Sequence, residues 1–445
     1  MRKSRYVGSD LVSRRKRVSF AAVMAVLAVS TLGVTLPPTA AAASSTATPL
    51  RVMVWGSQLE IGTYNRILDA WRQAHPDIPV RLEPTTFWEY LSKLQVQVAA
   101  DSAPDIVLLS GAFIPDLVDE GALTDLNPFI QQYKFPLEDY WDTHDILRVN
   151  GKMYALPMFG DVAALYYNRS AFDRAGVGTP NADWKWDDLR EAARKLTVRS
   201  GDTTKQYGVM WAVSGNGQSS YVNFLLQNGV RVLNDTRTSS LIDTEPAVKA
   251  IQYWTDIILR DGSAPRPDVL PATGEAFVAE KGTMIYHLVA LPINLFETAK
   301  FDWDVAPMPI GPKQRASEAN FVGFGMMAGS RQKEKAWKLL SFLVGEQSQS
   351  IFAAMRQNLP ALRKAIAAPA FADPRKPPRN LLPTLQVTMP YTYDLQFTKG
   401  WMEWSNLLGE TMVRISQGQV GVENGLRELA DKIDTVLRRV NAPKK

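Results

Sequence analysis

The chain has 445 residues, of which 46% are hydrophobic and 21% are charged, and it contains no cysteine. This is the composition of a globular protein with room for two α/β domains. The lack of cysteine excludes disulfide bonds, zinc–thiolate sites and cysteine catalysis. The formal net charge of +5 would by itself invite a nucleic-acid function.

That positive charge lies almost entirely at the start of the chain. Residues 1–43 hold seven basic side chains and one acidic one, so the rest of the chain holds 43 basic and 44 acidic side chains. Without an excess of basic groups, this larger part is not expected to bind nucleic acid.

The first 43 residues have the order of a signal peptide. A basic segment precedes an apolar stretch from Val18 to Leu36, and two prolines then lead to the small-residue run Ala41–Ala43. This run fits an A-x-A cleavage site before Ser44. A retained membrane anchor is the alternative, because an apolar stretch of this length just spans a bilayer. Arg14 and Arg15 leave a twin-arginine export route open. No cysteine is present to carry a lipid anchor.

Strand and helix patterns alternate after this leader. We expect strands over 51–55, 80–83 and 104–109, a helix from about 61 to 74, and a second helix over 89–100. This alternation predicts a parallel sheet covered on both faces. Ligands of such sheets bind beyond the carboxyl ends of the strands.

A second α/β unit begins near Ala163. Helices are expected up to Leu196 and over 221–227, 245–259 and 422–440, and strands over 207–211, 303–306 and 323–328. A proline-rich span, 368–383, is predicted to be a surface loop.

Sequence motifs of several enzyme classes are missing. The chain has no G-x-S-x-G, no G-x-x-x-x-G-K-[ST] and no H-E-x-x-H. The three histidines, His75, His144 and His287, have no metal-ligand spacing, although His287 could contact a ligand or lie on the surface. Gly215-Asn216-Gly217 is a turn rather than a dinucleotide loop, because Ser220 stands where a third glycine belongs. We therefore predict neither a metal nor a cofactor.

One carboxyl group stands out. Asp161 lies in an otherwise apolar stretch, where an isolated acid costs free energy unless a partner binds it. Sugar hydroxyls are good partners for a carboxylate. Glu89 and Glu403 would join Asp161 in the glycosidase alternative, which needs two carboxyls about 5–9 Å apart; the sequence does not give that distance.

The chain contains 12 tryptophans. Five of them, Trp55, Trp88, Trp211, Trp401 and Trp404, lie beside glycine or polar residues rather than inside long apolar runs. Aromatic rings stack on the apolar faces of pyranose rings. We expect some of the five to contact a ligand and the others to be core residues.

The run 151–168, GKMYALPMFGDVAALYYN, resembles the crossover segment of extracellular solute-binding proteins, the sugar-capturing receptors of ABC importers. Residues 51–56 are similar to the first strand of that family, and 99–105 to its Ala-x-Gly-x-x-Pro-Asp signature. Residues 121–126 resemble its Gly-x-Leu-x-x-Leu turn, and 277–284 resemble its Phe-x-x-Gly-x-x-Ala-Met segment. The order of these segments is the order in the family.

The resemblance extends from about Leu50 to about Val440. It implies an α/β, two-lobed periplasmic-binding-protein-like fold, in which each lobe is a mostly parallel sheet flanked by helices. Three crossovers between the lobes are expected at 157–162, 302–306 and 352–359. The implied division is a signal peptide over 1–43, an N-terminal lobe over 45–158 and 305–353, and a C-terminal lobe over 163–302 and 358–445.

The resemblance also implies a function. It predicts a monomeric extracytoplasmic receptor, not an enzyme, that captures a mono- or oligosaccharide between its lobes and delivers it to the permease subunits of an ABC importer. In relatives the acid at the position of Asp161 hydrogen-bonds sugar hydroxyls. The ring-stacking position of maltose-binding relatives falls at or near Ala290, so maltose is not the expected ligand. The predicted ligand-binding residues are Trp55, Gly56, Trp88, Glu89, Ser110, Gly111, Asp161, Trp211, Asn216, His287, Gly323, Phe324, Trp401 and Trp404.

Two other functions stay open at this point. One is a secreted carbohydrate-active enzyme, such as a glycosidase or lyase, and the other is a cell-wall protein without a ligand. The sequence does not name the sugar, its length or its anomer, nor which of Trp401 and Trp404 faces it.

Processing of the leader is testable. We expect the exported protein to begin at or near Ser44, because the alanine run ends there. Amino-terminal sequencing of the protein recovered outside the cytoplasm checks this. An intact Met1 or Arg2 end in the membrane fraction would show a retained anchor instead.

Overall fold

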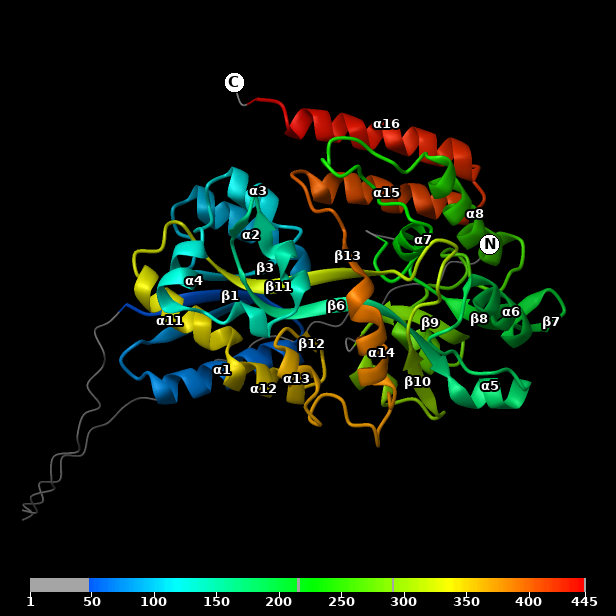
Figure 1. Ribbon diagram of the computed structural model, residues 1–445, viewed down its shortest axis with the longest axis horizontal. Coiled ribbons are helices and arrows are strands. Elements are labelled where there is room, and N and C mark those ends of the chain that lie inside the picture. The colour runs from blue at the N-terminus through cyan, green and yellow to red at the C-terminus, as the bar shows by residue number, and fades with distance from the viewer. Residues whose placement is uncertain (1–47, 214–216, 290–291, 444–445) are drawn as a thin grey trace, which may run out of the picture. The chain divides into compact units, whose positions relative to one another are not determined.

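A computed structural model describes residues 48–213, 217–289 and 292–443, apart from the side chains of Trp88 and Thr143 (Figure 1). The predicted leader and Asn216 lie outside the described residues. Within the described ranges, no helix combines the length and the apolar character that crossing a membrane requires.

The first group of strands is parallel, as predicted. β1 (Leu50–Trp55) lies between β2 (Val80–Thr85) and β3 (Ile106–Ser110), with Leu50 opposite Val80 and Val52 opposite Ile106. The helices between them are α1 (Gln58–Ala74) and α2 (Phe87–Ala99). The carboxyl ends of all three strands therefore lie at one edge of the sheet.

Local side-chain chemistry starts both helices at that edge. Ser57 caps α1: its hydroxyl accepts a hydrogen bond from the Glu60 N–H, and the Glu60 carboxylate accepts one from the Ser57 N–H. Thr86 caps α2 through the N–H of Glu89. Capping of this kind satisfies donors that a helix start would leave open. It also places Glu60 beside the end of β1.

Two long strands join this group to a second one. β11 (Ser317–Met326) runs antiparallel to β3, and β6 (Leu156–Asn168) runs antiparallel to β11. Residues 156–162 of β6 pair with β11, whereas 163–167 pair with β9 (Gly282–Leu288). β6 and β11 are called the linking strands below. β11 begins before the predicted 323–328. The prediction starts too late because Glu318 and Asn320 interrupt the apolar pattern of the strand. The predicted lobe limits stay a prediction.

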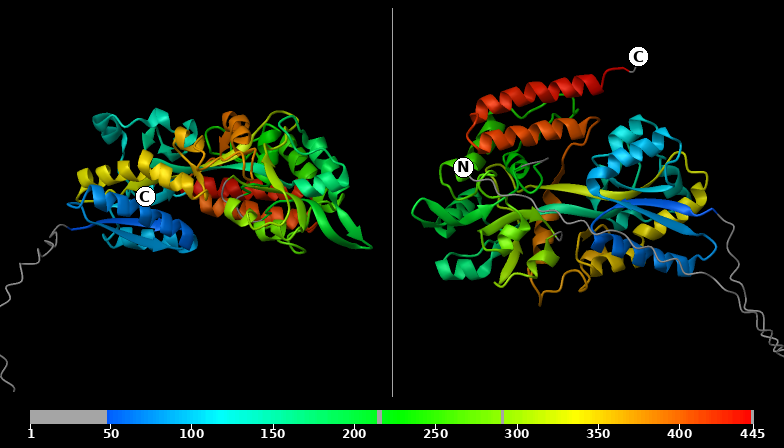
Figure 2. Two further views of the ribbon diagram at one scale, coloured as in Figure 1. Left: turned by 90° about the horizontal axis from the view of Figure 1, so that it is seen from below. Right: turned by 180° about the vertical axis from the view of Figure 1, so that it is seen from behind.

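The second group contains β9, β8 (Thr203–Met210), β7 (Val198–Ser200) and β10 (Trp303–Ala306). All four residues of β10 pair antiparallel with β6, with Ala306 opposite Leu165. Its main helices are α6 (Trp186–Leu196), α7 (Tyr221–Gln227), α8 (Glu245–Leu259), α15 (Trp401–Ser416) and α16 (Val422–Val440). The predicted bounds of α7, α8, α16 and β10 are confirmed. α15 and α16 lie side by side (Figures 1 and 2).

Helices cover both faces of the first group of strands. α1, α11 (Lys333–Val344) and α12 (Glu346–Ala354) lie on one face, and α2 and α3 (Ile114–Asp119) lie on the other (Figures 1 and 2). The remaining elements are α4 (Asn127–Tyr133), η1 (Leu137–Asp139), η2 (Asp142–Leu147), β4 (Arg148–Val149), β5 (Lys152–Met153), α5 (Arg169–Ala175), α9 (Gly274–Val278), α10 (Ile293–Phe296), β12 (Leu359–Pro360), α13 (Arg363–Ile366), α14 (Leu381–Thr388), η3 (Met389–Tyr391) and β13 (Thr392–Asp394). α14 begins inside the span that we predicted to be a loop.

The packing of α6 on β8 depends on one glycine. A Cβ atom at Gly208 would lie 1.9 Å from the carbonyl oxygen of Ala193. The Gly208 N–H also donates to the Thr197 hydroxyl, at 3.1 Å. The two backbones approach this closely only because Gly208 has no side chain.

We predict that Gly208→Ala lowers the free energy of unfolding by about 1–3 kcal/mol, the range for an overpacked core. Denaturant unfolding measures it. Gly62→Ala is the matched control, because nothing lies within 4 Å of a Cβ atom there and Gly62 is inside α1. The free energy of unfolding of this control should rise by about 0.5–1 kcal/mol. Equal effects of the two variants would contradict the close packing.

Candidate functional site

The linking strands carry polar side chains on one shared face. Asn320 of β11 lies directly opposite Asp161 of β6 in the antiparallel pairing. Glu318 lies two residues before Asn320 and therefore points to the same face. Diagonal neighbours of this kind are about 7–8 Å apart at Cα, within reach of long side chains.

The opposite face of the same strands is apolar. Phe321 lies opposite Gly160, where a Cβ atom would come within 2.8 Å of the Phe321 ring. Phe321 packs edge-on against Trp141, with the ring centroids 5.8 Å apart. The alternation of a strand thus separates a polar face from an apolar one.

Residues from other elements complete the polar face. The Asn320 amide donates to the hydroxyl of Ser110, at the end of β3, over 3.4 Å. The Ser219 N–H donates to Glu318 Oε1 over 3.2 Å, from the segment before α7. Ser110, Asp161, Ser219, Glu318 and Asn320 are called the polar cluster below.

The polar cluster is buried but not satisfied. Asp161 is 8% exposed and Glu318 is 0% exposed. Among the described residues, no hydrogen-bond partner is found for Asp161 Oδ1, Glu318 Oε2, Asn320 Oδ1 or Ser219 Oγ. Each such atom costs free energy, and native proteins keep few of them. Their gathering on one face makes the polar cluster the candidate site.

Burial also changes the acidity of the two carboxyl groups. Burial, followed by the nearby charge of Glu60, raises the pKa of Asp161 to about 7. Burial raises the pKa of Glu318 to about 8 although the Ser219 N–H opposes the rise, and Asp161 adds to it. Both groups thus titrate near neutral pH.

Aromatic rings lie at the end of β1. Trp55 makes edge contacts with Phe87, Tyr90 and Phe113, at centroid distances of 5.7, 4.7 and 5.8 Å. Phe87 begins α2 and is 41% exposed. Trp55, Phe87 and Phe113 are called the aromatic wall below. By the strand register Trp55 is level with Leu109, so the aromatic wall lies on the α2 side of the sheet, whereas Ser110 points to the other side. Exposed aromatic rings are common in the lining of carbohydrate sites.

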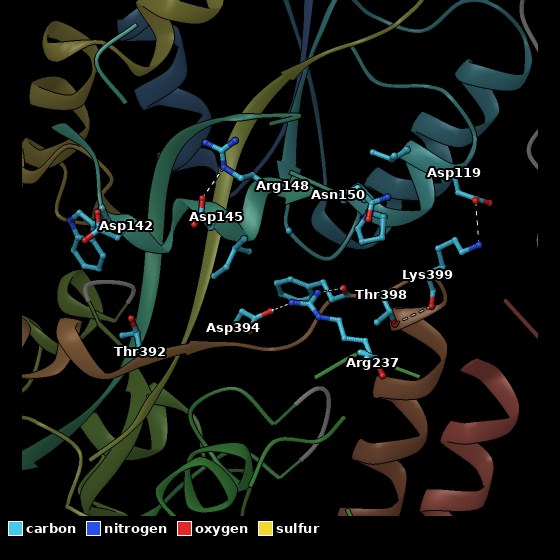
Figure 3. A pocket seen from close by; sticks show the side chains of 18 of the residues that line it. Asp119, Asp142, Asp145, Arg148, Asn150, Arg237, Thr392, Asp394, Thr398 and Lys399 are labelled. Atoms are coloured by element: carbon cyan, nitrogen blue, oxygen red, sulfur yellow. Dashed lines mark hydrogen bonds and ion pairs between the residues drawn. The ribbon is translucent and has the colours of Figure 1, made fainter. Parts of the chain in front are cut away.

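The structure also contains a cavity of about 1170 Å³ elsewhere (Figure 3). Trp141 and η2 line it on one side, and β13 and the segment 397–399 before α15 line it on the other. Gly111 lies at its edge, where a Cβ atom would meet Ile146 and Phe397 at 2.5 and 2.9 Å. Since Trp141 packs on Phe321, this cavity lies on the apolar face of the linking strands, opposite the polar cluster.

The charges around that cavity are paired with one another. Arg148 contacts Asp145 at 2.7 Å, Arg237 contacts Asp394 at 2.7 Å, and Lys399 contacts Asp119 at 3.2 Å (Figure 3). The Gly400 N–H donates to Asp116 at 3.1 Å. Side chains satisfied in this way need no ligand. The polar cluster, with its unpartnered buried atoms, is therefore the stronger candidate site.

Four predicted ligand-binding residues lie at or beside the candidate site. Ser110 and Asp161 belong to the polar cluster, and Trp55 belongs to the aromatic wall. Gly56 follows Trp55, and a Cβ atom there would come within 2.8 Å of the Glu60 Cβ.

Five others are core residues. Trp211 is buried among Phe224 and Tyr286, and Phe324 is buried against Tyr64. A Cβ atom at Gly323 would lie 2.3 Å from the Leu156 carbonyl oxygen, so this glycine serves strand packing. Trp401 and Trp404 are also buried, and the Trp404 indole N–H donates to the Thr398 hydroxyl. We therefore leave these five out of the site.

The remaining predicted residues lie elsewhere or outside the described part. Gly111 edges the cavity. Glu89 is exposed and accepts a hydrogen bond from the Thr86 hydroxyl. His287 lies opposite Ala164, on the other face of β6 from Asp161, where burial lowers its pKa. The Trp88 side chain and Asn216 are not described.

Sequence reasoning missed Glu318, Asn320, Ser219 and Phe87. For Glu318 a usable signal was present, because it is an isolated acid before an apolar strand, like Asp161. No comparable signal marks Ser219, whose role depends on a contact with a strand far along the chain. Among the described residues, no group of three or more histidine, aspartate or glutamate side chains could hold a metal ion.

Comparison with known proteins supports the predicted fold. The profile of the family described as bacterial extracellular solute-binding protein matches residues 55–350. A binding protein of Brucella abortus is 24% identical over 411 residues, which make up 90% of this chain and 96% of that protein. An ABC substrate-binding protein of Listeria monocytogenes, solved with cycloalternan, is 25% identical with a TM-score of 0.77, covering 87% of this chain and 98% of that one. The sugar-binding protein MalE of Xanthomonas citri has 19% identity and a TM-score of 0.77, covering 88% and 98%. The two-lobed α/β fold is thereby confirmed.

The raised pKa of Glu318 predicts a pH dependence of stability. Its folded-state pKa, about 8, exceeds the usual value for a glutamate. Its contribution to the free energy of unfolding is therefore fully present below about pH 4.5 and is lost as the pH rises through 8. Glu318→Gln cannot ionise and therefore avoids this loss of stability. The variant should have a higher melting temperature than the parent at pH 8 but not at pH 5. Thermal unfolding across this range measures the difference.

Glu83→Gln is the control with the opposite sign. The hydrogen bond from Arg51, at 2.7 Å, lowers the pKa of Glu83. The contribution of Glu83 to the free energy of unfolding is therefore present above its usual pKa and is lost as the pH falls. Glu83→Gln should thus be less stable than the parent at pH 8. A parallel response of both variants would contradict the assignment.

Proposed function

This chain belongs to the family of bacterial extracellular solute-binding proteins, and from that premise we propose that it is an extracytoplasmic carbohydrate receptor of an ABC importer. It captures a mono- or oligosaccharide between its two lobes and delivers it to permease subunits in the membrane. The proposal includes export by the leader and a monomeric receptor. It is supported by the similar receptors, one of which was solved with cycloalternan.

The observation that carries the proposal is the polar cluster. Buried oxygens of Asp161, Glu318 and Asn320 have no partner among the described residues, and the aromatic wall begins at the end of the neighbouring strand β1. A sugar offers hydroxyl groups and an apolar ring face at the same time. It can therefore satisfy carboxylates through charge-assisted hydrogen bonds and cover an exposed ring such as Phe87.

The position of the cluster on the linking strands connects binding to motion. Ser110 comes from the first group of strands and Ser219 from the segment before α7, so a ligand that contacts both draws the groups together. A ligand that contacts both sides favours the closed arrangement because its affinity for that arrangement is greater. The proposed ligand-contacting residues are Trp55, Gly56, Phe87, Ser110, Asp161, Ser219, Glu318 and Asn320.

The enzyme alternative is less well supported. The matching family and the similar solved structures are binding proteins. Incubation with a panel of oligosaccharides separates the two functions: saturable stoichiometric binding without turnover is expected, and product formation would establish the enzyme. A thermal-shift screen finds the sugars, because a ligand that binds the folded state raises the melting temperature.

We predict that Asp161→Asn weakens binding of the best sugar by about 10- to 100-fold, the scale of a hydrogen bond to a charged group at about 1.5–3 kcal/mol. The ligand-free variant should be at least as stable as the parent at neutral pH, because the buried carboxylate is unfavourable in the folded state. Calorimetric titration and thermal unfolding measure the two effects.

Asp142→Asn is the matched control. Asp142 lines the cavity on the other face, and its side chain is 92% exposed beside Arg363, so its loss should leave affinity unchanged. The reverse result, weaker binding in Asp142→Asn and unchanged binding in Asp161→Asn, would move the binding site to the cavity.

A further inference from the structure

The charge around the polar cluster has one sign. Asp161 comes from β6, Glu318 from β11 and Glu60 from the first turn of α1. Glu60 acts electrostatically on Asp161, and Asp161 acts on Glu318. No lysine, arginine or histidine is among the groups that act on either of these two carboxyls.

The other elements that approach the cluster contribute neutral groups. The end of β3 supplies the Ser110 hydroxyl, and the segment before α7 supplies Gln218 and Ser219, both of which donate hydrogen bonds to Glu318. His287 of β9 points to the opposite face, where its ring packs against Phe296. Nothing in this part of the described chain supplies a counter-charge.

Glu60 is satisfied, whereas the other two carboxyls are not. Glu60 accepts hydrogen bonds from the Ser57 N–H at 2.7 Å and from the Asn358 amide at 3.3 Å. Asp161 and Glu318 each retain a buried oxygen without a partner among the described residues, and so does the Ser219 hydroxyl beside Glu318. Two open carboxylate oxygens on one face are acceptors that require a donor, and preferably a positively charged one.

A metal ion does not fit this arrangement. No three acidic or histidine side chains of the described chain are grouped closely enough to coordinate one, and a hard cation such as Ca²⁺ takes six to eight oxygen ligands. An organic ammonium group needs only two or three acceptors, each at hydrogen-bond distance.

We infer that the solute carries a protonated amine, and that Asp161 and Glu318 bind this ammonium group, with the Ser219 hydroxyl as a further acceptor. The inference rests on the proposed carbohydrate receptor and narrows its ligand to an amino sugar or an oligosaccharide that contains one.

The physical reason is the repulsion between the two acids. A neutral sugar donates hydrogen bonds but leaves two like charges facing each other in a buried place, so one carboxyl stays protonated. An ammonium group between them favours ionisation of both. Binding should therefore release protons to the solvent near neutral pH, where both carboxyls titrate in the free protein.

The test is calorimetric titration of the exported protein at pH 7 with matched ligands. One set is the β-1,4-linked glucosamine disaccharide, its N-acetylated form and cellobiose; the second is glucosamine, N-acetylglucosamine and glucose. In the set that binds, the free amine should bind at least about tenfold more tightly than the N-acetyl and hydroxyl forms, as one charge-assisted hydrogen bond implies. Titration at pH 6, where the amine is already protonated and both carboxyls are largely un-ionised, in two buffers of different ionisation enthalpy should show proton release for the amine alone.

Glu318→Gln should abolish both the preference for the amine and the proton release, while a melting-temperature measurement verifies its folding. Asp161→Asn is the second variant, and Glu410→Gln, exposed on α15, is the control that should change neither. If the neutral member of a set binds as tightly as the amine, the inference is overturned and the proposed receptor stands. If no member binds and a wider panel of neutral oligosaccharides gives no thermal shift, both are overturned.

Discussion

Two strands carry the chain between its two groups of strands, and each brings a buried carboxyl group to the same face. Asp161 on β6 and Glu318 on β11 are buried, and no described cation compensates them. A fold selected only for stability would place apolar side chains there, as it does on the opposite face, where Phe321 covers Gly160. Violations of this kind in an otherwise consistent structure are expected at functional sites.

The rest of the first group of strands is arranged around that face. Parallel pairing of β1, β2 and β3 brings three strand ends to one edge, and the capping of α1 by Ser57 places the Glu60 charge near Asp161. The same edge carries the aromatic wall, because Trp55 ends β1 and Phe87 begins α2. Strand pairing thus brings the polar cluster and the aromatic wall to the same edge of the sheet, the cluster on the side of α1 and the wall on the side of α2.

How far the sequence predicts this arrangement depends on the range of the interaction. The bounds of α7, α8 and α16 follow from local patterns in the sequence, and the run that forms β6 is marked by its resemblance to the crossover segment of the family. The predicted start of β11 is late because Glu318 and Asn320 break the apolar run, although Glu318 is an isolated acid like Asp161. For the tryptophans, the expectation that some belong to the core is correct, but the sequence does not say which ones. Polar neighbours in the sequence did not predict that Trp211, Trp401 and Trp404 pack into the core, since that depends on helices distant along the chain.

Size and unsatisfied polar groups point to different parts of the molecule. The cavity beside η2 has a volume of about 1170 Å³, but its charged side chains are paired across it, as in Lys399 with Asp119. Ion pairs at a solvated surface contribute little net free energy, because each charge only exchanges contact with water for contact with its partner. A ligand in a cavity lined by such satisfied pairs therefore gains little from them. The polar cluster offers the opposite balance, since each unpartnered oxygen is a cost already present in the free protein. In the proposed receptor, contact with the solute would remove that cost, so the differential free energy of binding would be concentrated at the linking strands.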